Sequence, residues 1–390
     1  MSARTAYFTI CARNYLGYAR TLQSSWAASY GDRDFFIFLA DSPDHADRLL
    51  IPGATVVTVN DLRLDRLTEM AFKYSVLEFS TSIKPHCFQY LFDVLNYDRI
   101  IYLDPDIYVL RRLEHVESAL EQGAPCVLTP HITQPLNDGH HPSDIDILRG
   151  GVFNLGFAAF RKDDAAARYL AWWRAACEEA CFARMDQGYF VDQRYCDLAP
   201  CFIPNLVSLT HPGYNLAYWN LAQRQVRFTG DVYVVNDLPL YFVHFSGISQ
   251  ADPDRFSKYQ NRYRRKDLGD LIPLYDEYLE KLKNNDNQDG KSYSKMPYGY
   301  DYFKNGGKIV PALRRQYVAA RDGKMTGLDP FELGPEFFQA VTPEDTDKRV
   351  LASALLSPSF MIRNLARRFT KGRERTVRYW ERRIGPLTDA

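Results

Sequence analysis

Short apolar runs alternate with amphipathic segments along the first part of the chain. The runs lie at residues 7–12, 34–41, 55–59 and 99–103. They are rich in Ile, Val, Phe and Tyr, which predicts buried strands. Two other segments, 18–30 and 82–96, repeat apolar residues at helical spacing. This alternation predicts an α/β fold built on a mostly parallel sheet with helices on both faces.

The pattern continues towards residue 250. Further strands are predicted at residues 124–130, 151–161, 201–209, 232–236 and 240–246. Residues 131–150 are polar and without clear periodicity, which is typical of an active-site loop or lid. Residues 283–295, "KNNDNQDGKSYSK", have the composition of a linker or exposed loop.

These patterns divide the chain into three predicted parts. Residues 1–270 would form the main α/β domain, residues 271–345 an accessory and mostly helical region, and residues 346–390 a basic amphipathic tail. From Pro358 onward the tail carries nine Lys or Arg and three acids, a net charge of 9 − 3 = +6. Such a helix can lie on an anionic membrane surface, or pack on its own domain or on a partner subunit.

Charge and composition exclude several classes of protein. Lys plus Arg equals Asp plus Glu at 48 each, so no global field favours nucleic acid. No run of 18 apolar residues would span a membrane, and the N-terminus lacks the pattern of a signal peptide. Seven cysteines, an odd number, suit reduced thiols. We therefore expect a cytoplasmic protein that does not bind nucleic acid.

Two acids, Asp104 and Asp106, follow the run 99–103 directly and are the clearest candidates for chemistry. They could form a plain turn in which Asp104 caps the backbone. A phosphatase of the haloacid dehalogenase type also carries Asp-x-Asp after a strand, but near the N-terminus and usually continuing to Thr or Val rather than to Tyr108. The third interpretation is a divalent metal site, because a shared cation cancels the repulsion of two carboxylates. Ligands of parallel sheets lie at this end of the strands.

The motifs around this pair resemble, in order from about residue 7 to 250, those of a known family. It is the retaining glycosyltransferase family that contains glycogenin and the bacterial lipopolysaccharide galactosyltransferases. The matching segments are "TICARNYLGYARTLQSSW", "TSIKPHCF", "DPD", "FNLGFAAF", "VDQRY", "HPGYNLAYWN" and "VHFSG". The resemblance implies the GT-A fold, a Rossmann-like sheet flanked by helices, here with a helical C-terminal extension.

The resemblance implies which residues meet the donor nucleotide. Thr9, Asn14 and Tyr15 would approach the base, and Gly247 would let the backbone approach the diphosphate. Lys84 would lie near the donor phosphates, and a Lys before a helix N-terminus is a reasonable anion site. An isolated Lys at such a place is more often only a solvated charge. The family's Lys-Pro-Trp after its glycine is absent here, which leaves a basic phosphate contact missing unless Arg255 or Lys258 supplies it.

The resemblance also implies a metal site and a sugar site. Asp104, Asp106 and His244 would bind Mn²⁺ or Mg²⁺, although a lone strand-end His is more often a satisfied core residue. Asn154 and Gly156 would face the sugar; a buried structural Asn is the competing interpretation.

The residue that binds the sugar hydroxyls at the reacting face is left open between two Asp-Gln pairs. Asp192 in "VDQRY" is followed by Arg-Tyr-Cys, a departure from the family. Asp186 in "MDQGYF" is followed by Gln187 and Gly188, closer to the family's usual Asp-Gln-Gly.

Together these features predict a metal-dependent retaining hexosyltransferase. It would use a UDP-sugar and transfer to a glycan or lipid-linked glycan in bacterial surface polysaccharide synthesis, and the basic tail could bring it to the inner face of the plasma membrane. No nucleophile is evident, so front-side attack is expected. The alternatives are a nucleotidyltransferase, whose Gly-rich phosphate loop is missing from residues 11–17, and a nucleotide-sugar-binding protein without transfer.

Overall fold

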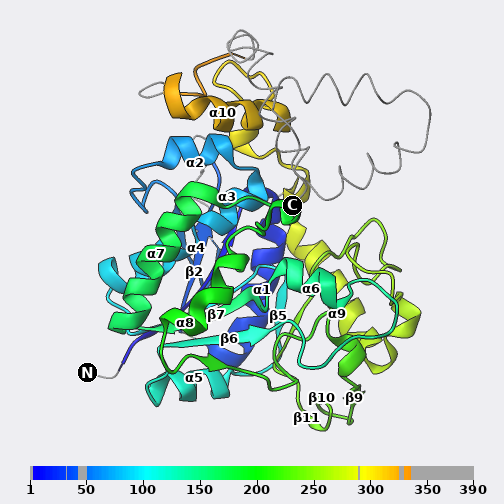
Figure 1. The fold of residues 1–390 in the computed structure, drawn as a ribbon. Coiled ribbons are helices and arrows are strands. Elements are labelled where there is room, and N and C mark those ends of the chain that lie inside the picture. Colours follow the sequence, from blue (N-terminus) through cyan, green and yellow to red (C-terminus); the bar gives the residue numbers. More distant parts are fainter. Residues whose placement is uncertain (1–2, 32, 43–50, 289, 325–328, 335–390) are drawn as a thin grey trace, which may run out of the picture.

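A computed structural model describes residues 3–31, 33–42, 51–288, 290–324 and 329–334 (Figure 1). Its centre is a seven-stranded sheet in the order β3-β2-β1-β4-β7-β6-β8. The strands are β1 Thr5–Cys11, β2 Asp34–Leu39, β3 Thr55–Thr58, β4 Arg99–Leu103, β6 Cys126–Pro130, β7 Phe153–Arg161 and β8 Val207–Ser208. Only β7 runs antiparallel to its neighbours β4 and β6. The predicted mostly parallel α/β sheet is confirmed.

Helices cover both faces of the sheet, and the two-residue period of the strands decides which side chain meets which helix. In β1, Tyr7 packs with α1 (Leu16–Tyr30) and α5 (Glu114–Glu121). Its neighbour Phe8 points to the other face, towards α3 (Val76–Ser82), α4 (Lys84–Gln89) and α7 (Asp164–Ala180). Both faces are apolar, which explains why the strands read as continuous apolar runs.

Smaller elements complete the described structure. The other strands are β5 Ile107–Val109, β9 Val226–Phe228, β10 Tyr233–Val235, β11 Leu238–Pro239, β12 Phe242–His244, β13 Asn287–Gln288 and β14 Lys291–Ser292. The other α-helices are α2 Leu67–Lys73, α6 Asp144–Gly150, α8 Ala199–Phe202, α9 Ile272–Asp286 and α10 Pro311–Lys324. The single turns used below are η1 Arg13–Tyr15, η4 Met185–Gln187, η9 Tyr293–Lys295 and η10 Gly299–Asp301.

Several segments differ from their predicted form. The polar stretch 131–150 ends in a helix, α6, which starts at a capping box between Ser143 and Asp146. The predicted strand 201–209 is the end of α8 followed by the two-residue strand β8. The predicted linker 283–295 is the end of α9, a short hairpin and η9, held together by the Asp286 carboxylate, which accepts a hydrogen bond from Ser294 N at 2.7 Å.

The region after residue 270 shares the cores of the sheet domain. In α9, Leu274 and Tyr278 pack with Val243 of β12. In α10, Leu313 and Tyr317 pack in the same cluster as α2 and α3. The boundary near residue 270 stays a prediction, and the predicted basic tail at residues 346–390 lies outside the described residues.

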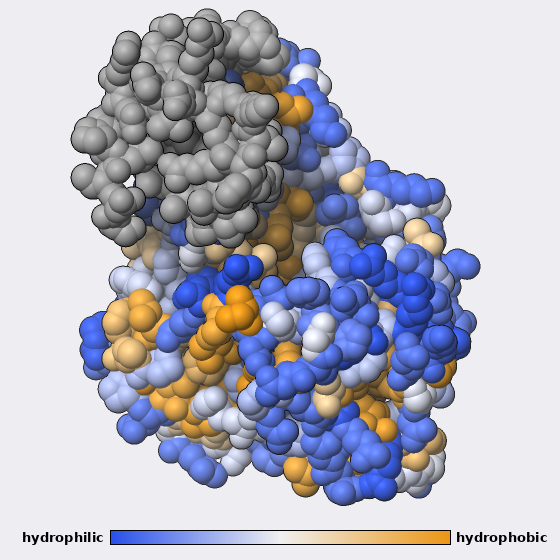
Figure 2. Space-filling model, turned by 45° about the vertical axis from the view of Figure 1, so that its right-hand side comes forward, coloured by the Kyte–Doolittle hydropathy of each residue, from blue (hydrophilic) through white to orange (hydrophobic). Residues whose placement is uncertain are grey.

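The surface shown in Figure 2 is mostly polar, with apolar residues gathered in a few patches. Within the described ranges, every helix is too short or too polar to cross a bilayer.

Candidate metal centre

The two acids of the pair lie on one turn between two strands. β4 ends at Leu103, and the chain turns through Asp104 and Asp106 into β5. Asp104 N donates a hydrogen bond to Gly156 O of β7 at 2.7 Å, and Ile107 N donates to Asp104 O at 3.0 Å. Backbone bonds on both sides thus fix the turn, and its carboxylates lie at the carboxyl end of β4, where ligands of such sheets bind.

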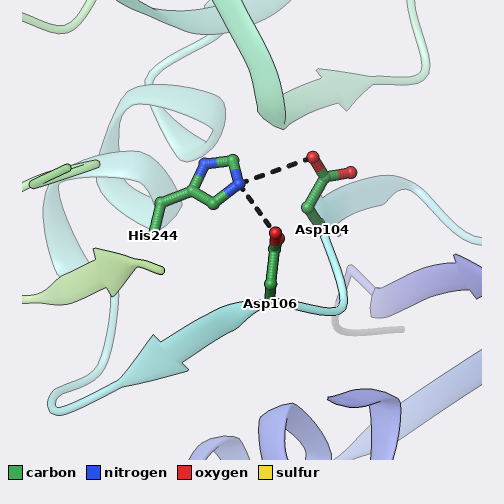
Figure 3. A group of neighbouring side chains, drawn as sticks. All are labelled: Asp104, Asp106 and His244. Atoms are coloured by element: carbon green, nitrogen blue, oxygen red, sulfur yellow. Dashed lines mark ion pairs between the residues drawn. The ribbon is translucent and has the colours of Figure 1, made fainter. Parts of the chain in front are cut away.

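The strand β12 brings His244 to this turn. It pairs antiparallel with β5, with His244 opposite Ile107, and Phe245 N donates to Asp106 O at 2.9 Å. The imidazole Nε2 lies 3.0 Å from Asp106 Oδ1 and 3.7 Å from Asp104 Oδ2 (Figure 3). One ligand atom from each of the three residues lies within 4.8 Å of the others.

Two buried amides fix the orientation of the His244 ring. Its Nδ1 lies 3.2 Å from both Asn154 Oδ1 and Asn215 Oδ1. The Asn215 amide nitrogen donates to Thr129 Oγ1 at 2.8 Å and to Asn154 Oδ1 at 3.0 Å, so its oxygen is turned to the ring. Facing two acceptors, Nδ1 carries the hydrogen. Nε2 then faces the acids; in the absence of a metal it shares a proton with Asp106, and loss of that proton leaves the tautomer that a metal ligand requires.

Gly156 provides the space for the ring. A Cβ at this position would lie 2.2 Å from His244 Cε1 and 2.6 Å from Nδ1. The backbone of Gly156 needs no left-handed conformation, since its φ is not positive. The glycine of "FNLG" is therefore explained by the imidazole packed on it, a contact that the sequence did not reveal.

The charges of the cluster favour a bound cation. Burial lowers the pKa of His244, but the carboxylates of Asp106 and Asp104 outweigh burial and raise it. Burial raises the pKa of Asp104, against the opposing effect of Lys84 and His244. Two carboxylates and one imidazole nitrogen are a donor set that suits a divalent ion such as Mn²⁺. These residues therefore fit the predicted metal.

A buried ion pair lies beside the acid turn. Lys84 Nζ is 2.7 Å from Asp192 Oδ2, and both side chains are 2% exposed. Lys84 also donates to Leu155 O at 2.8 Å and lies 4.3 Å from the centre of the Tyr102 ring. Burial lowers the pKa of Lys84, but the carboxylates of Asp192 and Asp104 outweigh burial and raise it. The Tyr102 hydroxyl donates to Asp104 and so connects the pair to the acid turn.

The two Asp-Gln pairs lie in different surroundings. Asp192 and Gln193 are buried, and Gln193 Oε1 accepts hydrogen bonds from Leu155 N at 2.9 Å and Asn154 Nδ2 at 3.4 Å. Asp186 is exposed on η4. Within the described parts of the chain, no hydrogen bond or ion pair joins Asp186 to the metal cluster. The structure thus brings Asp192, and not Asp186, to the acids.

The residues predicted to meet the nucleoside and diphosphate lie at three places: in β1, on η1 and shortly after β12. Thr9 is completely buried in β1, and its hydroxyl has no hydrogen-bond partner within the described ranges. Asn14 and Tyr15 lie on η1, where Tyr15 is 41% exposed and stacks on Tyr18 with ring centres 4.6 Å apart. Gly247 has φ +76°, and a Cβ there would lie 2.6 Å from Ser257 Oγ.

His131 is a part of the site that sequence reasoning missed. It is buried, and its Nε2 lies 3.2 Å from Asn154 Nδ2. Burial lowers its pKa to about 4, so it is neutral at physiological pH and can accept that hydrogen bond. A lone His after a strand carries no sequence signal for this role.

Comparison with known proteins gives distant similarities. No family model matches the chain. It is similar to two uncharacterized proteins of Bacillus subtilis (strain 168): YfnF, 28% identical over 284 residues, which cover 70% of this chain and 91% of YfnF, and YfnD, 25% identical over 261 residues, which cover 64% and 80%.

Solved structures with a similar fold are glycosyltransferases. One is the galactosyltransferase LgtC in complex with donor and acceptor sugar analogs, at TM-score 0.41 and 15% identity, covering 72% of this chain and 95% of LgtC. Another is GlyE of Streptococcus pneumoniae TIGR4, at TM-score 0.41 and 17% identity, covering 77% of this chain and 67% of GlyE.

Proposed function

We propose that this chain is a metal-dependent glycosyltransferase that moves a hexose from a UDP-sugar to a glycan or lipid-linked glycan, with retention of configuration. The observation that carries the proposal is the cluster of Asp104, Asp106 and His244 at the carboxyl end of β4. Further support comes from Asn154 and Asp192, because segments far apart in the sequence that resemble one enzyme family adjoin this cluster.

In this proposal Asp104, Asp106 and His244 would hold Mn²⁺ or Mg²⁺ near the donor phosphates. The cation, when bound, offsets the charge that develops on the leaving UDP. Asn154 and Asn215 keep the His244 ring in the binding tautomer. Lys84 adds a fixed positive charge close to Asp104.

The chemistry at the sugar follows from the state of Asp192, a carboxylate that lies beside the acid turn. Asp192 is in contact with Lys84, so a covalent bond to this carboxylate would require the ion pair to break. We therefore place Asp192 and Asn154 as groups that position the sugar. The bond from the anomeric carbon to the diphosphate oxygen breaks as the acceptor oxygen bonds to the same face, and the acceptor proton passes to the departing phosphate. Asp186, exposed on η4, has no role in this scheme.

The experiment that tests the proposal is calorimetric titration of the full chain with UDP, with and without Mn²⁺. We expect binding that depends on Mn²⁺ and is lost in Asp106→Asn, because one of the two carboxylates that hold the ion is gone. A matched control is Asp276→Asn, which removes an acid of the surface pair with Arg265. This control should bind as the native chain does.

The other outcomes decide between the remaining interpretations. UDP binding that needs no metal and survives Asp106→Asn would contradict the metal-dependent mechanism. Binding without transfer to any acceptor would favour a nucleotide-sugar-binding protein. If neither UDP nor another nucleoside diphosphate binds with Mn²⁺, the proposed function is wrong.

A further inference from the structure

Asp41 joins three segments of the chain at the carboxyl end of β2. It is 1% exposed. Its Oδ2 accepts hydrogen bonds from Arg13 N at 3.1 Å and Arg13 Nε at 3.3 Å. Its Oδ1 accepts from Ser42 N and from Gly299 N, both at 2.8 Å. One buried carboxylate thus ties the turn η1 to Gly299, a residue 258 positions after Asp41 in the sequence.

Gly299 is placed where no larger residue fits. A Cβ there would lie 2.5 Å from Ser42 Cβ and 2.9 Å from Asp41 Oδ1. Gly299 belongs to the segment "MPYGYDYF" at residues 296–303, which has no role in the proposed transfer. The close contact with Asp41 and Ser42 explains why this segment has a glycine here.

The same region also supports η1 from a second side. The turn η9 packs against η1 and α1. Arg20 of α1 donates to the Tyr293 hydroxyl at 3.2 Å and lies over its ring, 5.0 Å from the centre. Asp286 anchors η9 through the backbone and hydroxyl of Ser294, both at 2.7 Å. The chain after α9 therefore packs against η1 and the start of α1.

The turn η1 presents an unpaired hydrogen-bond acceptor and an exposed aromatic ring. Asn14 Oδ1 is buried and has no hydrogen-bond partner in the described parts of the chain. Tyr15 is 41% exposed and stacks on Tyr18 of α1, and the charges of Asp106 and Asp104 contribute to raising its pKa after the larger effect of burial. A buried acceptor without a donor costs free energy, and a bound ligand that donates to it removes that cost.

We infer that Asp41 and the segment around Gly299 are positioning elements of the nucleoside end of the donor site. They hold η1 so that Asn14 and Tyr15 receive the base while the diphosphate reaches the metal cluster. This inference rests on the proposed function. It makes the accessory region a determinant of donor affinity, although none of its residues needs to touch the donor.

The test compares Gly299→Ala and Asp41→Asn with two matched controls. Gly307→Ala lies in the same region, and its Cβ would meet only the Asn305 side chain, at 3.1 Å, and Phe303. Asp61→Asn changes another turn carboxylate, which accepts from Thr58 N at 2.8 Å. Hydrogen exchange of the amides of residues 12–18 is measured without ligand, and calorimetry then measures Mn²⁺ alone and UDP with Mn²⁺.

We expect faster exchange at residues 12–18 in both test variants and a loss of UDP affinity of about tenfold or more, since hydrogen bonds to a charged group are removed. Mn²⁺ affinity should not change, and both controls should match the native chain. Unchanged UDP affinity in a folded Asp41→Asn would overturn the inference, as would unchanged exchange at η1. A native chain that binds Mn²⁺ but no nucleoside diphosphate would instead remove the proposed function, and the nucleoside role of η1 with it.

Discussion

Gly156 packs directly against the His244 ring, so a side chain at this position would displace one of the three proposed metal ligands. In Gly156→Ala the new Cβ would lie 2.2 Å from His244 Cε1, so the ring must move off the acids. We expect a loss of stability of about 1–3 kcal/mol, typical of overpacking, and a much larger loss of Mn²⁺ affinity. The measurements are urea unfolding and Mn²⁺ titration followed by electron paramagnetic resonance.

A control for this change is available in the segment before β7. In Gly150→Ala the nearest atom outside the helix, Gln193 Nε2, would be 4.0 Å from the new Cβ. This variant should keep native Mn²⁺ affinity. Native affinity in Gly156→Ala would mean that the His244 ring is not a ligand.

The Lys84–Asp192 pair makes a different kind of prediction at the residue scale. Asp192→Asn leaves a buried ammonium without its counter-charge, and breaking such a pair costs about 3–5 kcal/mol. Chemical denaturation should show this loss in full, while the double change Lys84→Met with Asp192→Leu should recover part of it. Equal stability of the single variant and the native chain would show that the pair contributes no net stability.

Single residues also show how far the sequence determined the site. The acids at the end of β4 were visible because charged residues rarely end a buried strand, and the resemblance added His244. Lys84 and Asp192 were assigned separately to phosphates and to sugar, yet they contact each other. Their pairing depends on the packing of α4 against the segment after η4, and no local pattern of either segment encodes it.

At the scale of elements, one arginine joins α10 to α2 and η10 by hydrogen bonds, in addition to the apolar packing of Leu313 and Tyr317. Arg314 is 6% exposed and donates to the carbonyls of Ala71, Tyr74 and Tyr300, at 3.0, 2.6 and 2.7 Å, and to Asp301 Oδ1 at 2.8 Å. A cation at the C-terminal end of α2 also meets the negative end of the helix dipole.

Arg314→Ala should release α10 from α2 while the central sheet stays folded. The reason is that several buried carbonyls lose their donor together. Hydrogen exchange at residues 67–74 and 311–319 should accelerate, and the melting temperature should fall. Arg315→Ala, at the exposed neighbouring position, is the control. Slow exchange in Arg314→Ala would show that apolar contacts alone hold the helix.

Helices and strands were predicted well where the apolar pattern was clear, and poorly where the element was short. The run 99–103 is β4, residue for residue. The predicted helix 82–96 is largely confirmed, since α4, with Pro85 in its first turn, continues as a π-helix at Tyr90–Val94. Residues 131–150 were read as a loop because α6 is short and its apolar residues are partly exposed.

At the scale of the whole molecule, charge is divided unevenly along a chain with no net charge. The +6 carried from Pro358 onward is balanced by the rest of the chain. We expect the full chain to bind vesicles that contain phosphatidylglycerol, since each basic residue near an anionic surface contributes about 1 kcal/mol. Co-sedimentation should fall steeply as salt rises, because such attraction is screened.

Replacing Arg375, Arg378, Arg382 and Arg383 by Gln should abolish that binding and leave UDP binding unchanged. Vesicles of phosphatidylcholine alone serve as the neutral control. Equal binding to both kinds of vesicle, or no dependence on salt, would contradict a role of the basic tail at a membrane.

The pairing of β5 with β12 has a consequence for the nascent chain during its synthesis. The two acids emerge from the ribosome 138 residues (244 − 106) before the histidine that completes their site. At synthesis rates of about 5–20 residues per second, the acids wait roughly 7–28 s for that histidine. During this interval the nascent chain holds two of the three proposed ligands, so the complete metal site would form only after β12 has been synthesised. If the proposed function is right, fragments that end before β12 should not bind the donor.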